Sequence, residues 1–94
     1  MVTMNPKNRD WFVYMLECCN GKIYTGITTN MEERFKKHVE GKGAKFTQRN
    51  TPSHILAFTV CENRSQASKL EWEVKQLTAE KKRALGIHWN AQHH

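Results

Sequence analysis

The chain has 94 residues, which is enough for one domain with a modest hydrophobic core. No apolar run approaches the roughly 20 residues that cross a bilayer, and the N-terminus lacks the apolar stretch of a secretory signal. We therefore expect a cytoplasmic protein without a membrane partner.

Three cysteines, none in a Cys-x-x-Cys spacing, argue against a disulfide framework or a thiolate zinc site. Fifteen Lys and Arg against nine Asp and Glu give a net charge of +6, which favours a polyanionic partner, nucleic acid first. Charge alone leaves purely non-specific binding equally open.

The first predicted element is a hairpin. WFVYMLEC (11–18) is rich in aromatic and β-favouring residues and predicts a strand. Asn20-Gly21 predicts a two-residue turn, because both residues tolerate a positive φ. Residues 22–26 are predicted to form the returning strand. Gly26 is expected where that strand leaves the sheet, and its missing Cβ would let a backbone or a nucleic-acid ligand approach closely.

A helix is predicted to start at Asn30, which forms a capping box with Glu33, and to end at Gly41. Its apolar residues recur at i, i+4 and i+8 and form the predicted buried stripe: Met31, Phe35 and Val39. Arg34 and His38, also spaced i and i+4, line one flank of that stripe. They can therefore reach a common point beside the sheet.

Residues 41–52 are predicted to form a loop that contacts nucleic acid. Its glycines expose backbone amides, and Lys42 and Lys45 supply charge, the combination that phosphate binding favours. A flexible, solvated loop is an equally open interpretation. Lys75, on a later helix, extends this basic surface. Residues 54–61 predict the third strand.

Two helices complete the prediction. Ser65 is expected to cap a long helix that runs to Leu77. The apolar face of this helix consists of Ala67, Leu70, Val74 and Leu77. Thr78 is expected to cap a last short helix over 79–86. Trp72 lies opposite the apolar face, and we expect the last helix to cover it; an exposed ring that stacks a base or meets a partner is the alternative.

The predicted order is β-β-α-β-α-α, a small three-stranded antiparallel sheet flanked by helices, in the α+β class. Residues 11–87 are expected to form one domain between flexible segments at 1–10 and 88–94. One small sheet leaves room for a site only on its exposed face.

An ordered set of short motifs spans residues 11–80. These are FVY at 12–14, YTG at 24–26, Arg34, His38, GKGAKFT at 41–47 and SKLEWEVKQLT at 68–78. In this order and spacing the set resembles the GIY-YIG nuclease superfamily, in its small stand-alone, YhbQ-like form. FVY stands where the family has Gly-Ile-Tyr, and YTG stands where it has Tyr-Ile-Gly. Both tyrosines and the second glycine are kept, and the resemblance implies a GIY-YIG endonuclease-like fold.

The resemblance also implies hydrolysis of a phosphodiester around one divalent cation, Mg²⁺ or Mn²⁺. By position, Tyr14 would help to deprotonate the attacking water and Tyr24 would orient the water or the phosphate. Arg34 would hold the scissile phosphate, because its planar fork suits two oxygens. His38 would position the water or shuttle a proton. Glu71 would bind the metal, since Mg²⁺ needs only one or two protein carboxylates.

Each of these residues has a purely structural interpretation. Tyr14 and Tyr24 could be cross-strand aromatics that stabilise the hairpin by ~0.2–1 kcal/mol. A phenol with a pKa near ~10 also needs help from a metal or from Arg34 to act as a base. Without the resemblance, Arg34 and His38 would be a solvated helix flank.

Glu71 is the metal ligand that the residue pattern supports least. It lies about 80° to one side of the apolar stripe of its helix, and Glu73 lies about 80° to the other. Periodicity cannot choose between the two, and only the motif selects Glu71. Its structural interpretation is an ion pair with Lys75 at i+4.

The leading functional hypothesis is an endonuclease that acts on DNA with a structure or weak sequence preference, in repair or recombination, with RNA as a second substrate class. The alternative is a non-catalytic or weakly active nucleic-acid-binding module, for which a protein partner could supply substrate choice. A third hypothesis is a structural protein whose surface contacts other proteins.

Overall fold

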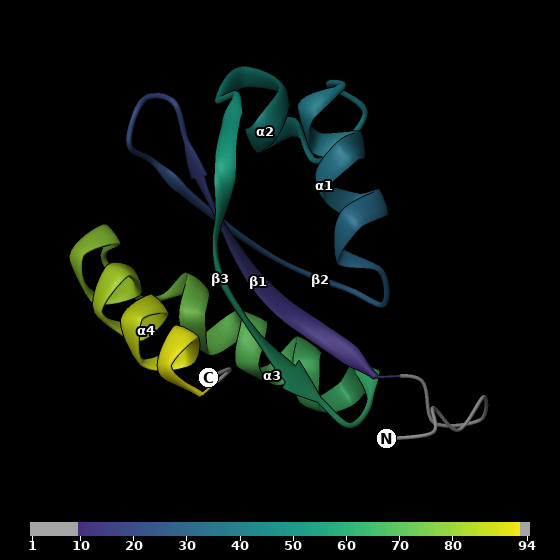
Figure 1. The fold of residues 1–94 in the computed structure, drawn as a ribbon, viewed down its shortest axis with the longest axis vertical. Helices are drawn as coiled ribbons and strands as arrows, with labels where there is room; N and C mark the ends of the chain where they lie inside the picture. The colour runs from purple at the N-terminus through teal and green to yellow at the C-terminus, as the bar shows by residue number, and fades with distance from the viewer. Residues whose placement is uncertain (1–9, 93–94) are drawn as a thin grey trace.

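The computed structural model describes residues 10–92, so the tail residues 1–9 and 93–94, expected to be flexible, lie outside the described part. Figure 1 shows a small sheet between two groups of helices. The elements in chain order are β1 (Trp11–Cys18), β2 (Ile23–Thr28), α1 (Met31–Val39), α2 (Lys45–Arg49), β3 (Pro52–Cys61), α3 (Arg64–Lys75) and α4 (Ala79–Ala91). None of the helices in the described residues is long and apolar enough to cross a membrane.

The sheet is three-stranded and antiparallel in the order β2-β1-β3, which confirms the predicted α+β class. β1 is the central strand, and its register places Tyr14 between Gly26 of β2 and Phe58 of β3. The two faces of β1 alternate, as the period of a strand requires. Val13 and Met15 face the core under α3 and α4, while Tyr14 faces α1.

The hairpin turn differs from its prediction. Among the described residues only glycines have positive φ, so Asn20 does not, whereas Gly21 has a φ of 84°. The loop is closed by bonds from the Cys18 amide to the Lys22 carbonyl (2.8 Å) and from the Gly21 amide to the Cys18 carbonyl (2.9 Å). It is therefore longer than two residues, with one left-handed glycine. β2 also continues to Thr28, so that Gly26 lies inside the strand and not at its end.

Helix α1 starts as predicted and turns a different face inward. The Asn30 side chain accepts a bond from the Glu33 amide (3.1 Å), and Gly41 follows the helix with a φ of 78°. The predicted stripe is wrong at Val39, which is 50% exposed, and the buried residue of the helix is His38. The reason is chemical, since His38 finds two hydrogen-bond partners beneath the helix and is thereby satisfied in the interior.

The second half differs from prediction in one additional helix and in the boundaries of two others. The predicted loop contains the one-turn helix α2. Helix α3 is capped by Asn63, whose side chain accepts from the Gln66 amide at 2.9 Å, and not by Ser65. Helix α4 starts after Thr78 as predicted but runs to Ala91, so residues 88–91 are helical and not a flexible tail. Trp89, 4% exposed in the core, is what extends it.

The predicted apolar face of α3 packs on the sheet, with Ala67 and Val74 fully buried and Leu70 packed against them. Trp72 points away from this face and is 66% exposed, so the expectation that α4 covers it is wrong. Gly86 of α4 faces the sheet against Ala57.

Candidate active site

A chain of hydrogen bonds links β1, α1 and α2. The Tyr14 hydroxyl lies 2.8 Å from His38 Nε2, and His38 Nδ1 lies 2.7 Å from Thr47 Oγ1. The Thr47 hydroxyl donates to the Ala44 carbonyl at 2.9 Å. Because a hydroxyl has one hydrogen, Thr47 must accept from His38 Nδ1–H. Neutral His38 then has a bare Nε2, which accepts from the Tyr14 hydroxyl.

His38 is held neutral by its surroundings. Tyr14, His38 and Thr47 are 1%, 0% and 2% exposed. Burial, and then the positive charge of Arg34, lower the pKa of His38 to about 4. His38 Nε2 therefore carries no proton at neutral pH and is free to accept the hydrogen bond from Tyr14.

Burial dominates Tyr14 as well and raises its pKa to about 12. A hydrogen bond from Arg34 opposes this shift, whereas the charges of Tyr24 and Glu71 reinforce it. At neutral pH the phenol of Tyr14 keeps its proton. Ionisation of this phenol would need additional positive charge beside the oxygen.

Arg34 lies one helical turn before His38, as the i, i+4 spacing predicts, and is bonded to the two tyrosines. The hydrogen bond to Tyr14 is the largest cause that raises the pKa of Arg34, and a further bond joins it to Tyr24. Arg34 also lines an open hollow of about 310 Å³. The remaining walls of the hollow are Trp11, Ile27, Thr28, Thr29, Asn30, Glu33 and Lys37. Arg34 is thus reached from solvent at this hollow.

Tyr24 completes an aromatic cluster over this face of the sheet. Its ring centroid lies 6.3 Å from that of Tyr14, 5.0 Å from His38 and 5.8 Å from Phe46. Phe46 is 37% exposed. The cluster therefore runs from the buried His38 to the surface at α2.

Two glycines make this packing possible. A Cβ at Gly26 would lie 2.5 Å from the Tyr14 hydroxyl oxygen and 2.9 Å from Tyr24 Cε2. A Cβ at Gly43 would overlap His38 Nδ1 and lie 2.9 Å from its Cε1. The close approach expected at Gly26 is thus made by Tyr14 itself. A nucleic-acid contact of Gly26, which is buried, remains a prediction.

Glu71 approaches the cluster from α3. Its charge is close enough to Tyr14 to raise the pKa of that phenol. Its carboxylate also pairs with Lys75, at 3.4 Å, and its side chain is 22% exposed, whereas Glu73 is exposed on the helix surface. The ion pair with Lys75 is therefore present, and the role of Glu71 as a metal ligand stays a prediction.

The only carboxylate that we find at this site to bind a cation, among the described residues, is that of Glu71. Within residues 10–92 no group of three or more His, Cys, Asp and Glu side chains could hold a metal. One carboxylate facing solvent suits Mg²⁺, which keeps several waters and uses one or two carboxylates together with substrate phosphates. Glu71 thus fits one weakly held hard cation and not a dedicated metal cage.

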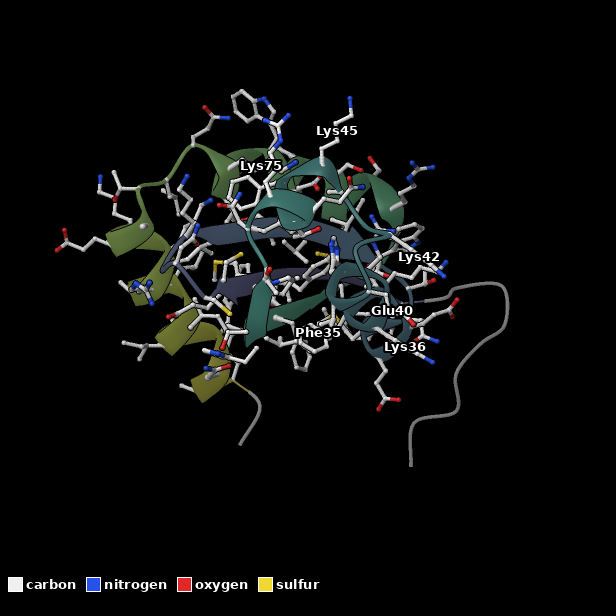
Figure 2. The ribbon with its side chains drawn as sticks, turned by 90° about the horizontal axis from the view of Figure 1, so that it is seen from above. Phe35, Lys36, Glu40, Lys42, Lys45 and Lys75 are labelled. Atoms are coloured by element: carbon white, nitrogen blue, oxygen red, sulfur yellow. The ribbon has the colours of Figure 1, made fainter. Side chains whose placement is uncertain are left out.

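The predicted nucleic-acid-binding lysines divide into two sets. Lys45 and Lys75 extend from α2 and α3 on the same side of the molecule in Figure 2, whereas Lys42 lies toward Glu40 and Lys36. Lys45 lines a second hollow, of about 480 Å³, together with Lys22, Phe46, Arg49 and Asn50. The structure does not bring Lys42 to this hollow.

The sequence did not single out three residues of the cluster. Thr47, Gly43 and Phe46 all lie in GKGAKFT. This segment was predicted to be a loop whose glycines and lysines contact phosphates. The signal was a threonine and an aromatic next to one another in an otherwise small and basic stretch. Only the fold of α2 over His38 shows what they contact.

The site thus combines Tyr14 and Tyr24 on one face of a three-stranded antiparallel sheet with Arg34 and His38 on the helix that covers this face. The chain belongs to the GIY-YIG family: the model of the GIY-YIG catalytic domain matches residues 10–84. It is similar to a UPF0213 protein of Cupriavidus necator, 45% identical over 75 residues, 80% of this chain and 82% of the relative. A UPF0213 protein of Desulfotalea psychrophila is 43% identical over 76 residues, 80% of this chain and 69% of the relative.

Two solution NMR structures resemble the fold. The UPF0213 protein of Bacillus halodurans superposes with a TM-score of 0.51 at 42% identity, over 81% of each chain. A protein of E. faecalis gives a TM-score of 0.62 at 31% identity, over 100% of this chain and 96% of its own. Together with the family match, these likenesses place the chain among the small GIY-YIG proteins.

Proposed function

We propose that this chain is a divalent-metal-dependent endonuclease that hydrolyses phosphodiester bonds of DNA, with RNA as a second substrate of the same chemistry. The observation that carries the proposal is the convergence of Tyr14, Arg34 and His38 through hydrogen bonds, with the charge of Glu71 within reach. Membership of a nuclease family supports the reaction class. The net charge of +6 supports a polyanionic substrate.

Each residue of the site has a separate role in the proposed hydrolysis. The phenol oxygen of Tyr14 takes a proton from the attacking water while its own proton moves to the bare Nε2 of His38, so that neither ion has to form alone. Arg34, and the cation that Glu71 would hold, would supply the positive charge that this transfer needs. The hydroxide forms the new bond to phosphorus, and the bond to the leaving oxygen breaks. The leaving oxygen takes up a proton from solvent, and His38 releases the proton it received, which restores both groups and balances the reaction. Arg34 holds two phosphate oxygens with its fork, and its bond to Tyr14 stabilises the negative charge that develops on the phenol oxygen.

Tyr24 is hydrogen-bonded to Arg34 and packs on His38. It thereby holds the guanidinium and the imidazole in fixed positions relative to one another. Glu71 would hold Mg²⁺ or Mn²⁺, which supplies the positive charge that lowers the barrier at the phosphate and at the leaving oxygen. Lys45 and Lys75 would contact backbone phosphates on the same side of the molecule.

The test uses the purified chain and labelled single-stranded, duplex, flapped and branched DNA, with Mg²⁺, Mn²⁺ or EDTA. Cleavage of at least one substrate in Mg²⁺ or Mn²⁺, absent in EDTA, is expected. Inertness on every substrate in both metals would overturn the proposal.

A second candidate is a nucleic-acid-binding module without turnover. The observation that favours it is the ion pair between Lys75 and Glu71, which occupies the carboxylate proposed for the metal. This candidate predicts salt-sensitive DNA binding that survives Glu71→Ala, with no cleavage in any metal.

A further inference from the structure

The hollow at α2 is built differently from the one beside Arg34. Three cations and one aromatic ring line it, together with Asn50, and no carboxylate does. Within the described part of the chain, no ion pair engages Lys22, Lys45 or Arg49. Its volume of about 480 Å³ lies in the ~300–1,000 Å³ range of small-ligand pockets. Such a lining suits an anionic ligand with an aromatic part.

Phe46 gives this hollow a fixed stacking surface. The ring is 37% exposed, and it packs on Tyr24 at 5.8 Å with a tilt of 32°. Asn50 supports the same helix turn, since its amide donates to the Phe46 carbonyl at 2.9 Å and accepts from Asn20 at 2.6 Å. Because Phe46 already packs on Tyr24, its ring loses little conformational entropy when a second ring stacks on its exposed side.

We infer that this hollow binds one unpaired nucleotide, with the base stacked on Phe46 and the adjoining phosphates on Lys22, Lys45 and Arg49. A base-paired nucleotide does not fit this description, because both faces of its base are already stacked in the duplex. Stacking on aromatic side chains combined with a cationic groove is the general means of holding single strands.

The position of the hollow assigns the nucleotide a place in the substrate. Phe46 contacts Tyr24, and Tyr24 contacts His38 at 5.0 Å. The stacked base therefore belongs to a nucleotide next to the scissile phosphate. This last step rests on the proposed function, whereas the binding itself does not. The chain thus prefers an unpaired strand or a junction with an unpaired nucleotide beside the bond to be cut.

The test measures binding in EDTA, so that it is independent of cleavage. The full chain is titrated into a labelled 12-nucleotide single strand and into the matching duplex, and anisotropy is followed. Phe46→Ala should weaken binding to the single strand by about 5- to 160-fold, with little change for the duplex, and Phe46→Trp should bind as the parent does. Val39→Ala, which removes another exposed apolar side chain, is the matched control and should change neither.

A single abasic nucleotide, moved along the strand, locates the stacked base. One position should lower affinity for the parent chain and have no effect on Phe46→Ala, because the two changes remove the same contact. Equal weakening of single strand and duplex, or an abasic profile that Phe46→Ala leaves unchanged, would overturn the inference. Either result leaves metal-dependent cleavage by the parent chain, and hence the proposed function, untouched.

Discussion

His38 Nδ1 and Thr47 Oγ1 lie 2.7 Å apart, and this contact fixes which nitrogen of His38 carries the proton. The Thr47 hydrogen is committed to the Ala44 carbonyl, so Thr47 can only accept from the imidazole. The other nitrogen is left bare toward Tyr14. In the mechanism that we propose, Thr47 is thus a positioning residue, which acts through His38 and does not touch the substrate.

Thr47→Val keeps the shape of the side chain and removes its oxygen. We expect kcat to fall about 10-fold with KM nearly unchanged, the loss of roughly one hydrogen bond in the reacting state. Thr47→Ser should restore activity. ¹⁵N NMR of His38 should show a single tautomer in the parent and Ser variant and a mixture in the Val variant. A Val variant with parental kcat and parental ¹⁵N shifts would contradict this role.

The stability of the protein should depend on His38 below neutral pH. Its pKa is about 4 in the folded state, against the ordinary 6.5, so the unfolded chain binds more protons between these values. The free energy of unfolding should therefore fall as pH drops from 6.5 to 4, by at most ~3 kcal/mol from this residue. Urea unfolding at pH 7, 6, 5 and 4 measures it. His38→Gln should lose less stability over the same interval, and an identical loss in the two proteins would refute the assignment.

Gly43→Ala places a methyl group against the His38 ring. Because His38 is held from both sides, we expect a loss of ~1–3 kcal/mol in the free energy of unfolding. Gly86→Ala is the control in another buried position, where the nearest atoms would lie 3.4–3.5 Å away. That change should leave stability within ~1 kcal/mol or increase it, since alanine is the better helix former. Equal effects of the two substitutions in urea unfolding would argue against a tight His38–Gly43 contact.

Arg34→Lys retains the charge but not the planar fork that reaches two tyrosines and two phosphate oxygens. We expect kcat to fall by ~10²-fold or more, the usual cost of removing a donor to a developing oxyanion. Lys36→Ala, an exposed change on the same helix, should cleave at the parental rate. Circular dichroism confirms that each variant is folded. Parental cleavage by the Lys variant would mean that the fork has no role.

Local pattern predicted β1 to the residue and the start of α1, because hydrophobic composition and an Asn cap are signals carried by neighbouring residues. The spacing of Arg34 and His38 likewise predicted that they share one side of the helix. The ends of α3 and α4 were missed, since Asn63 competes with Ser65 as a cap and only tertiary burial of Trp89 extends α4 to Ala91.

The interior of the site could not be read from periodicity. A helix wheel favours Val39 over His38 for the core, yet the polar partners Tyr14 and Thr47 come from a distant strand and from α2. Thr47 and Gly43 acquire meaning only once α2 folds back over α1. The same wheel could not distinguish Glu71 from Glu73; the structure does, because only the charge of Glu71 reaches Tyr14.

That distinction provides the most direct test of the central claim. Single-turnover cleavage of the substrate that the parent cuts best is measured in Mg²⁺ for the parent, Glu71→Gln and Glu73→Gln. The account predicts parental rates for Glu73→Gln and loss of ~10²-fold or more for Glu71→Gln, with the fold of both variants intact. Equal cleavage by the two variants, or unchanged cleavage by Glu71→Gln, would contradict a metal-dependent site at Tyr14, Arg34, His38 and Glu71.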